Sequence, residues 1–350
     1  MKIGLLTYHH SANIGAMMQT YATCRALKEL GHEVVIVDIR QPERQHHGIK
    51  KIVSTVFLGK HLYDLEYFEH VFYPAMTRRY YNLEDLRNNP PQVDCLLVGS
   101  DQTWNPDKSK EVSMAYFLDF GDEKLKRISY ASSFGAAIWE RSEEMTKMVN
   151  EALHRFDFIS VREKSGLKIC NQTFGLNSQL VLDPTLLFEG YPEITGAIKQ
   201  RDELLCYKLT RNNDFFNNIN NVKRLINLPV RLLNNPTPVR GLRYTYPPSV
   251  KEWVQRIGGA RFILTDSFHG VAFSLNYQRQ FVVIRNHTIR DARFVELLEA
   301  VGLEDRIFDS VEDLSKADGW KEPINYSDVN ARLNKMRESS WNYLKQALIN

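Results

Sequence analysis

The chain has 350 residues, of which 43% are hydrophobic, 25% charged and 11% aromatic. These proportions are typical of a folded globular protein and exclude a disordered or fibrous chain. The formal net charge is +3, from 45 basic and 42 acidic residues, and this balance argues against the concentrated basic face that nucleic-acid binding needs. The length exceeds one ordinary core and fits two domains of roughly 150 residues each.

The cysteines and the N-terminus indicate a cytoplasmic protein. Cys24, Cys95, Cys170 and Cys206 lie far apart without a C-x-x-C pair, so neither a zinc site nor a disulfide framework is expected. The opening MKIGLLTYHH turns polar after about six apolar-leaning residues, which is too few for a signal peptide. No stretch approaches the ~20 apolar residues of a membrane-spanning helix.

The first forty residues predict a strand, a loop, a helix and a second strand. The apolar run KIGLLTY leads into the turn-forming HHSANIG, after which Met17, Tyr21, Cys24 and Leu27 recur at helical spacing. Gly31 is a natural helix stop, and EVVIVDI is a β-branched strand. This βαβ unit implies a parallel sheet with a right-handed crossover.

The same alternation continues to a junction rich in proline and glycine. The runs DCLLVGSDQ, RISYASSFG, FDFISVRE and QLVLDPT predict buried strands, and SEEMTKMVNEALHRF predicts a helix. Pro184, Gly190 and Pro192 then mark a domain boundary. We therefore expect a doubly wound α/β domain over residues 1–190.

A second strand and helix series follows and predicts another domain over residues 191–325. Its strands are LLCYKL, PVRLL, RFILT and QFVVIR, with helices between them. The final SDVNARLNKMRESSWNYLKQAL predicts a C-terminal helix within 326–350, capped by Ser327. The predicted fold class is thus α/β, with two Rossmann-like domains built on parallel sheets.

Candidate site residues follow from a rule of open parallel sheets, in which ligands bind beyond the carboxyl ends of the strands. The residues delivered there include His9, His10, Asn13, Asp38, Arg40, Asp101, Gln102, Arg162, Asp183, Asp266, Ser267 and His269, with Arg293 further on.

Each candidate has a structural interpretation beside the functional one. Asp101 and Asp266 are at positions where aspartate often caps a helix or forms a turn. Arg162 either pairs with Glu163 or binds a ligand, and one histidine of the pair at residues 9–10 either binds or faces solvent. His269 favours function, because it follows a strongly apolar strand and the next residue, a glycine, opens the backbone to close approach.

Several other site types lack their sequence signatures. The first βα turn has no G-x-G-x-x-G, and the chain has neither a P-loop, a G-x-S-x-G elbow nor an H-E-x-x-H pair. No metal-ligand set is visible. The segment RQHHGIKKIVSTVFLGKHLYDLEYF is basic and then amphipathic, and has two interpretations: peripheral contact with an anionic membrane carrying a lipid-linked substrate, or a helix covering a domain flank.

Six motifs in chain order resemble the polysaccharide pyruvyl transferase family, in the branch found in bacterial capsule and exopolysaccharide clusters. They are TYHHSANIGAMMQTYA, VGSDQTWNP, ISYASSFG, ISVREKSG, VLDPTLL and LTDSFHGVAFSLNY, and the resemblance spans about residues 1 to 305. It implies a fold similar to the glycosyltransferase-B arrangement, with a cleft between the domains. It also implies transfer of the enolpyruvyl unit of phosphoenolpyruvate onto a sugar, giving a cyclic pyruvate ketal.

The resemblance also assigns residues. His269 falls on the family's histidine at the start of a second-domain helix, where we expect it to act as catalytic acid or base. Arg162 matches the arginine of a family motif that consists of an arginine, an acidic residue, any residue and a serine, in that order. Many members have an arginine where this chain has Ser267, so another cation must neutralise the donor, and Arg293, Arg285 and Arg162 are the candidates.

The expected donor-binding residues are therefore Arg162, Ser267, Gly270 and Arg293, and the expected acceptor-binding residues are Asn13, Asp101 and Gln102. Phosphoenolpyruvate enters as a substrate, the acceptor is a glycan or its lipid-linked precursor, and neither a cofactor nor a metal is expected. Two alternatives remain: a nucleotide-sugar glycosyltransferase of similar fold, and a non-catalytic member that keeps the fold.

Overall fold

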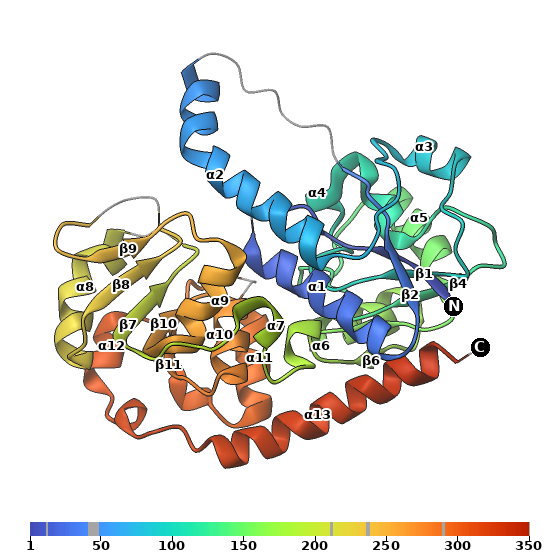
Figure 1. Ribbon diagram of the computed structural model, residues 1–350. Coiled ribbons are helices and arrows are strands. Elements are labelled where there is room, and N and C mark those ends of the chain that lie inside the picture. The colour runs from blue at the N-terminus through green and yellow to red at the C-terminus, as the bar shows by residue number, and fades with distance from the viewer. Residues whose placement is uncertain (12, 41–48, 211–212, 236–238, 289–290, 350) are drawn as a thin grey trace. The chain divides into compact units, whose positions relative to one another are not determined.

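The computed structural model describes residues 1–350 except 12, 41–48, 211–212, 236–238, 289–290 and 350 (Figure 1). It divides into two compact units. Unit 1 comprises residues 1–51, 67–187 and 335–350, and unit 2 comprises residues 52–66 and 188–334. The division at 187/188 lies close to the expected 190/191, but the C-terminal segment is not separate, because its last residues belong to unit 1.

Unit 1 is built on a parallel sheet in the order β2-β1-β3-β4. Its strands are β1 (Lys2–Leu6), β2 (Glu33–Ile36), β3 (Cys95–Val98) and β4 (Lys126–Ser129). Single parallel bridges connect this sheet to the pair β5 (Ser160–Val161) and β6 (Gln179–Leu180). All four residues of β3 are buried, as expected for a parallel strand covered on both faces.

The helices of unit 1 begin where the sequence supplies caps. Asn13 caps α1 (Ile14–Glu29) by accepting a hydrogen bond from Gly15 N–H, and Ser142 caps α5 (Glu143–Leu153) through Met145 N–H. The remaining helices are α3 (Leu83–Asn88), α4 (Pro106–Ser109), α6 (Lys164–Lys168) and the 3₁₀ segment η1 (Lys110–Phe117).

The segment predicted to be basic and amphipathic forms α2 (Ile49–Phe72). Arg44, His46 and His47, which supply part of its basic character, lie outside the described residues. In the second half of the helix Tyr63 and Tyr67 are exposed whereas Phe68 is buried, so that half is amphipathic. Within the described residues, no helix combines the length and apolar content needed to cross a bilayer.

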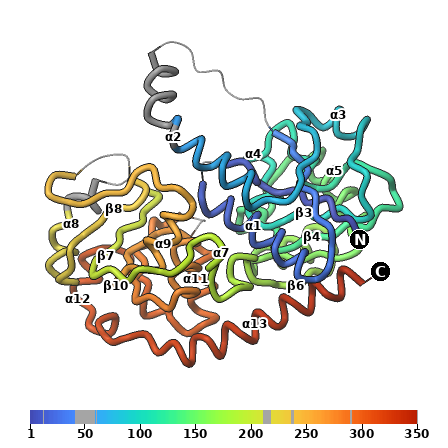
Figure 2. Tube along the Cα trace, in the orientation of Figure 1, coloured from blue at the N-terminus to red at the C-terminus, as the bar shows by residue number. Residues whose placement is uncertain are grey.

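Unit 2 has a six-stranded sheet in the order β12-β11-β10-β7-β8-β9, and all its pairings are parallel. Its strands are β7 (Arg201–Tyr207), β8 (Val230–Leu233), β9 (Arg243–Thr245), β10 (Ala260–Thr265), β11 (Gln280–Ile284) and β12 (Ile307–Phe308). Figure 2 labels β7, β8 and β10 along the chain trace. Strand order reverses between β7 and β10, the position at which doubly wound sheets bind ligands.

Helices cover both faces of this sheet, so the strand side chains alternate between two cores. Leu204 and Leu232 pack in one cluster with residues of α8 (Asn213–Ile226) and α12 (Val311–Lys316). On the other face Trp253 of α9 (Val250–Gly259) packs against Tyr207 and against Phe273 of α10 (Phe268–Asn276). The unit also contains α7 (Pro192–Thr195) and α11 (Ala292–Val301). The predicted α/β class with parallel sheets is confirmed.

The C-terminal helix α13 covers Tyr326–Ala347 and begins one residue earlier than expected. Ser327 therefore lies inside it, and its N–H donates to Asn325 Oδ1 at 3.1 Å, so the capping side chain belongs to Asn325. Arg337, Ser340, Leu344 and other residues at a spacing of three or four are buried, which gives the helix one packed face.

Candidate functional site

A pocket of about 410 Å³ opens at the carboxyl end of the unit 1 sheet. Its wall combines the loop after β1, the N-terminus of α1 and residues that follow β2 and β3. The lining side chains used below are Tyr8, His10, Ser11, Asn13, Arg40, Asp101, Lys108 and Tyr116. The pocket volume lies within the range of small-molecule sites, and its place matches the edge where parallel sheets bind ligands.

The adjacent histidines at the end of β1 differ in their surroundings. His9 is 2% exposed, and its two ring nitrogens lie 3.2 Å from Thr7 O and 3.0 Å from Asp38 Oδ1. His10 lines the pocket, its side chain is 33% exposed, and Nδ1 lies 2.8 Å from Glu69 Oε1. His9 thus holds the base of the loop, whereas His10 presents its imidazole to the cavity.

Asp38, which follows β2, is surrounded by basic side chains. Its carboxylate lies 2.6 Å from Arg40 Nε and 3.5 Å from Arg79 Nε, in addition to His9. Burial raises the pKa of Asp38, but the hydrogen bonds from His9 and Arg40 outweigh it and hold that pKa well below its ordinary value. Asp38 is therefore ionised and keeps Arg40 in place beside the pocket.

Asp101 lines the pocket with a left-handed backbone, at φ 76°. Aspartate tolerates this region better than most residues, and such conformations persist where neighbouring contacts hold them. Its Oδ1 accepts a hydrogen bond from Gln102 N–H, and its Oδ2 lies 3.5 Å from Lys108 Nζ. Lys108 also lies over the ring of Tyr8, 4.4 Å from its centre.

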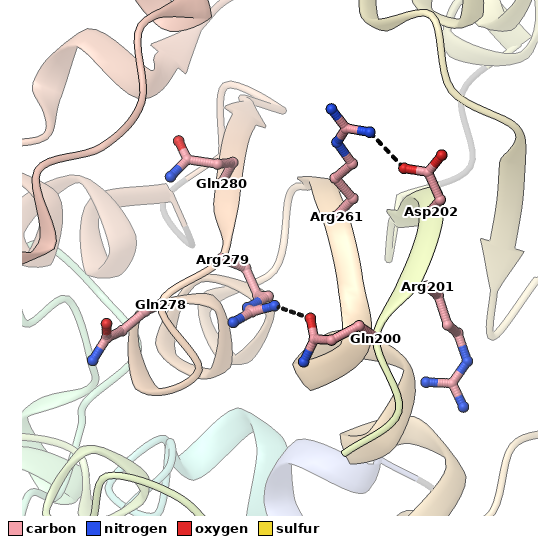
Figure 3. A pocket seen from close by; sticks show the side chains of 7 residues that line it. All are labelled: Gln200, Arg201, Asp202, Arg261, Gln278, Arg279 and Gln280. Carbon is pink, nitrogen blue, oxygen red and sulfur yellow. Dashed lines mark hydrogen bonds and ion pairs between the residues drawn. The ribbon is translucent and has the colours of Figure 1, made fainter.

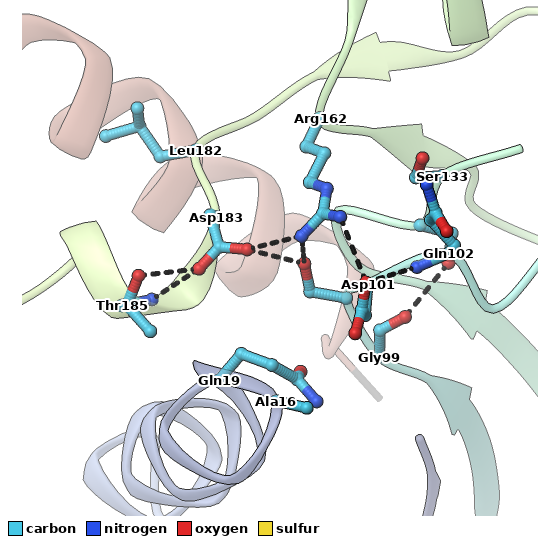
Figure 4. A network of polar contacts seen from close by, with 12 residues as sticks. Ala16, Gln19, Gly99, Asp101, Gln102, Ser133, Arg162, Leu182, Asp183 and Thr185 are labelled. Atoms are coloured by element: carbon cyan, nitrogen blue, oxygen red, sulfur yellow. Dashed lines mark hydrogen bonds and ion pairs between the residues drawn. The ribbon is translucent and has the colours of Figure 1, made fainter. Parts of the chain in front are cut away.

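Arg162, expected to bind the donor, is buried in a network of carboxylates (Figure 4). Its side chain is 1% exposed and lies 2.8 Å from Asp183, 3.3 Å from Asp101 and 3.5 Å from Glu163. Burial lowers the pKa of Arg162, but the three carboxylates outweigh it and raise that pKa above its ordinary value. Arg162 thus joins the loops after β3, β5 and β6 through its carboxylate partners.

Two of the three expected acceptor residues line the pocket, and the third does not. Asn13 and Asp101 line the pocket, whereas Gln102 does not: its backbone carbonyl accepts a hydrogen bond from Tyr8 Oη, and its side chain lies under Gly135. Asp183 accepts hydrogen bonds from Ser100 and Thr185, so its role is structural. Only Asn13 and Asp101 are placed to reach a pocket ligand.

In unit 2, Asp266 organises the carboxyl edge of the sheet. Its oxygens accept hydrogen bonds from Leu209 N–H at 2.6 Å, Thr210 N–H at 3.0 Å and Asn286 Nδ2 at 2.9 Å, and Lys208 Nζ lies 3.3 Å away. These partners follow β7 and β11, the strands on either side of β10. Asp266 therefore joins the loops of three neighbouring strands.

Ser267 and Gly270 have structural roles where ligand contacts were expected. Ser267 is the N-cap of α10 and accepts a hydrogen bond from Gly270 N–H at 3.4 Å. A Cβ on Gly270 would lie 2.3 Å from Thr265 Oγ1, so glycine is needed for α10 to pack on β10.

His269 and Arg293 both lie close to the ring of Phe268. His269 is 7% exposed in the first turn of α10, and its ring centre is 5.3 Å from that of Phe268. The guanidinium of Arg293, at the start of α11, lies 6.0 Å from the centre of Phe268. Arg285 is engaged with Asp291 and Asp309. A histidine and an arginine thus lie at the carboxyl edge of the unit 2 sheet.

A second pocket, of about 490 Å³, lies at the opposite edge of this sheet (Figure 3). Arg201 donates to Lys199 O and Gln255 O, and Arg279 donates to Tyr277 O. Burial lowers the pKa of both guanidiniums. Carbonyls at helix C-termini carry partial negative charge, so these arginines serve chiefly to satisfy the ends of α9 and α10.

Among the described residues, no group of three or more histidine, cysteine, aspartate or glutamate side chains is arranged to hold a metal ion. The four cysteines are buried and reduced. Burial raises the pKa of the Cys95 and Cys206 thiols to about 12.

Comparison with known families connects this geometry to a protein class. A family model described as polysaccharide pyruvyl transferase matches residues 13–288. The chain belongs to this family. The match covers the pocket residues from Asn13 to Tyr116 and the α10 region with His269, whereas Tyr8, His10 and Ser11 precede it and Arg293 follows it. The comparison with curated proteins found no match.

Solved structures similar to this pyruvyl transferase family member share its fold. MnaA of S. aureus, in a co-structure with UDP, is 13% identical over 99% of this chain and 96% of that chain, with a TM-score of 0.55. The UDP-N-acetylglucosamine 2-epimerase of Rickettsia bellii is 12% identical over 99% and 98%, at 0.51. The glycotransferase of kitacinnamycin is 13% identical over 99% and 97%, at 0.52. These neighbours confirm the glycosyltransferase-B-like fold.

Sequence reasoning missed part of the pocket. The lining residues Lys108 and Tyr116 come from α4 and η1, and Glu69, the partner of His10, comes from α2. None of them follows a strand, so the strand-end rule does not find them. His10 and Arg40 were candidates at strand ends, but their sequence neighbours gave no sign of which carboxylate each would meet.

Proposed function

We propose that this protein transfers the enolpyruvyl unit of phosphoenolpyruvate onto a sugar of a polysaccharide or of its lipid-linked precursor, forming a pyruvate ketal. Family membership over residues 13–288 is the observation that carries this proposal. The structural neighbours contribute the fold alone, because fold does not fix function.

The unit 2 edge has side chains suited to the donor. Phosphoenolpyruvate carries a phosphate and a carboxylate, which favour arginine and helix N-terminal amides. Arg293, beside Phe268, is our proposed donor cation, and His269, in the first turn of α10, is the proposed acid or base. With Ser267 occupied as a helix cap, Arg293 takes the place of the arginine that many family members carry there.

The unit 1 pocket has side chains suited to a sugar acceptor. Sugar hydroxyls both donate and accept hydrogen bonds, and Asn13, Asp101, Ser11 and Lys108 offer both kinds of group. Each cation we identify there lies beside a carboxylate, Lys108 near Asp101 and Arg40 near Asp38, so the pocket is polar with its charges paired. Such a site suits a neutral, hydroxyl-rich ligand better than a dianion.

The test is an assay of purified protein with phosphoenolpyruvate and a panel of methyl glycosides bearing free diols. We expect phosphate release and a glycoside product whose mass increases by pyruvate less one water. Phosphoenolpyruvate at 100 times its Kd should also stabilise the fold by about 2.7 kcal/mol. His269→Ala should lower turnover ~10²–10⁴-fold. Stabilisation by a nucleotide sugar instead, without phosphate release, would contradict the proposal.

A further inference from the structure

His10 has one ring nitrogen engaged and the other available at the pocket. Nδ1 lies 2.8 Å from Glu69 Oε1, whereas Nε2 has no hydrogen-bond partner among the residues that the structure describes. A carboxylate oxygen accepts hydrogen bonds and a ring N–H donates them, so the contact with Glu69 engages Nδ1 and leaves Nε2 for a pocket ligand. Glu69 is itself buried and lies 4.0 Å from Arg40 Nη2.

The neighbouring His9 provides the contrast within the same loop. Both of its nitrogens lie within hydrogen-bond distance of oxygen atoms, Thr7 O and Asp38 Oδ1. It also belongs to the pocket lining, but it is only 2% exposed. Of these two histidines, His10 has the more exposed ring and the nitrogen that lacks a hydrogen-bond partner among the described residues.

We infer that Nε2 of His10 is the base that removes the proton from the sugar hydroxyl attacking the donor, and that Glu69 positions it. The inference rests on the proposed pyruvyl transfer and adds a catalytic residue on the acceptor side. A carboxylate that fixes a histidine tautomer and stabilises the resulting imidazolium is a recurring arrangement in enzymes that activate hydroxyl nucleophiles.

The proton balance of ketal formation requires such a group. Protonation of the donor methylene gives a methyl group and an electron-poor neighbouring carbon, to which the first hydroxyl oxygen bonds while its proton passes to His10. The carbon–oxygen bond to phosphate then breaks with both electrons on phosphate, and the second hydroxyl adds with loss of its proton. Of the two protons lost by the hydroxyls, one makes up for the proton that was added to the donor methylene. The other leaves bound to phosphate.

The kinetic test compares His10→Gln, Glu69→Gln and a matched control, His154→Gln, an exposed histidine at the end of α5. His10→Gln should lower kcat ~10²–10⁴-fold. Glu69→Gln should lower kcat at least ~10-fold with glycoside KM within ~3-fold, the signature of a lost transition-state interaction. His154→Gln should match the wild type.

A labelling experiment separates access from folding. Diethyl pyrocarbonate should modify His10 and spare His9 in the native protein, and methyl glycosides that are turned over should slow modification of His10. If wild-type protein turns over a glycoside while His10→Gln retains more than a third of kcat, the assignment of His10 is wrong and pyruvyl transfer stands. If no glycoside gives phosphate release and phosphoenolpyruvate does not stabilise the protein, the proposed function fails, and the role of His10 with it.

Discussion

At the scale of single residues, buried charges at the strand ends have two distinct roles. Asp266 and Arg162 are surrounded by partners from several loops and fix the backbone of the carboxyl edges. His10 and Lys108 have one carboxylate partner each in the contacts described above, and part of each side chain faces solvent. Because a ligand needs a group that can still form contacts, the second kind of residue carries the functional proposals, and the first kind should be tested by stability.

Asp38 should make the stability of unit 1 depend on acid pH. Its folded-state pKa lies below the ~3.9 of an unfolded aspartate, so its stabilisation is fully present above that value and is lost as pH falls through the folded-state pKa. Asp38→Asn should lower the free energy of unfolding by about 3 kcal/mol at pH 7, because His9, Arg40 and Arg79 lose their counter-charge.

Urea denaturation from pH 7 to pH 2.5 measures this difference. The gap between wild type and Asp38→Asn should shrink below about pH 4. Asp318→Asn, which alters an exposed ion pair, should leave the free energy of unfolding at pH 7 unchanged. An Asp38→Asn gap that is unchanged at pH 2.5 would show that the carboxylate charge is not the source of stability.

Gly270 should be intolerant of a side chain. Its added Cβ would meet Thr265 Oγ1 at 2.3 Å, and relief requires α10 to move away from β10, so Gly270→Ala should cost about 1–3 kcal/mol. Gly59→Ala in α2 is the matched control, because nothing lies within 4 Å of its Cβ and alanine favours a helix by about 1 kcal/mol. Gly270→Ala should lower the urea midpoint and Gly59→Ala should raise it. Equal shifts in the two variants would exclude the steric explanation.

At the scale of elements, the N-cap of α10 is a test of what Ser267 does. Ser267→Ala should lower stability by about 0.5–2 kcal/mol and leave KM for phosphoenolpyruvate unchanged within ~2-fold, because its hydroxyl serves Gly270 N–H. Ser249→Ala, the equivalent cap of α9, gives the matched loss of stability. A rise of tenfold or more in KM with Ser267→Ala alone would instead place this hydroxyl on the donor.

The elements show how far the sequence leads. The long buried strands and the capped helices were predictable, because apolar runs, Ser142 and Ser249 act locally. Strands β9 and β12 were missed, because runs of three and two residues carry no periodicity. The burial of Arg162 could not be predicted from the sequence either, because its partners Asp101 and Asp183 lie 61 and 21 residues away in sequence. Contacts of this range depend on how strands are ordered in the sheet.

At the scale of the whole molecule, unit 1 is assembled from separated stretches of chain. Its last stretch, residues 335–350, contacts segments that come far earlier in the sequence. Tyr343 Oη donates a hydrogen bond to Ser129 O at 2.8 Å, and Ser340 Oγ accepts one from Leu182 N–H at 2.9 Å. Leu344 and Leu348 are buried beside them. A boundary drawn at residue 190 therefore cuts unit 1 off from part of its own core.

Removing residues 335–350 should destabilise unit 1 selectively. The truncated chain loses the hydrogen bonds to Ser129 and Leu182 and the buried apolar surface of Tyr343, whose replacement by alanine alone should cost about 3–5 kcal/mol. Hydrogen exchange should accelerate at β4 and β6, while β7 and β10 of unit 2 keep their protection. Glu338→Ala, at an exposed position of the same helix, should leave exchange unchanged. Equal acceleration in both units would mean that residues 335–350 stabilise the chain as a whole.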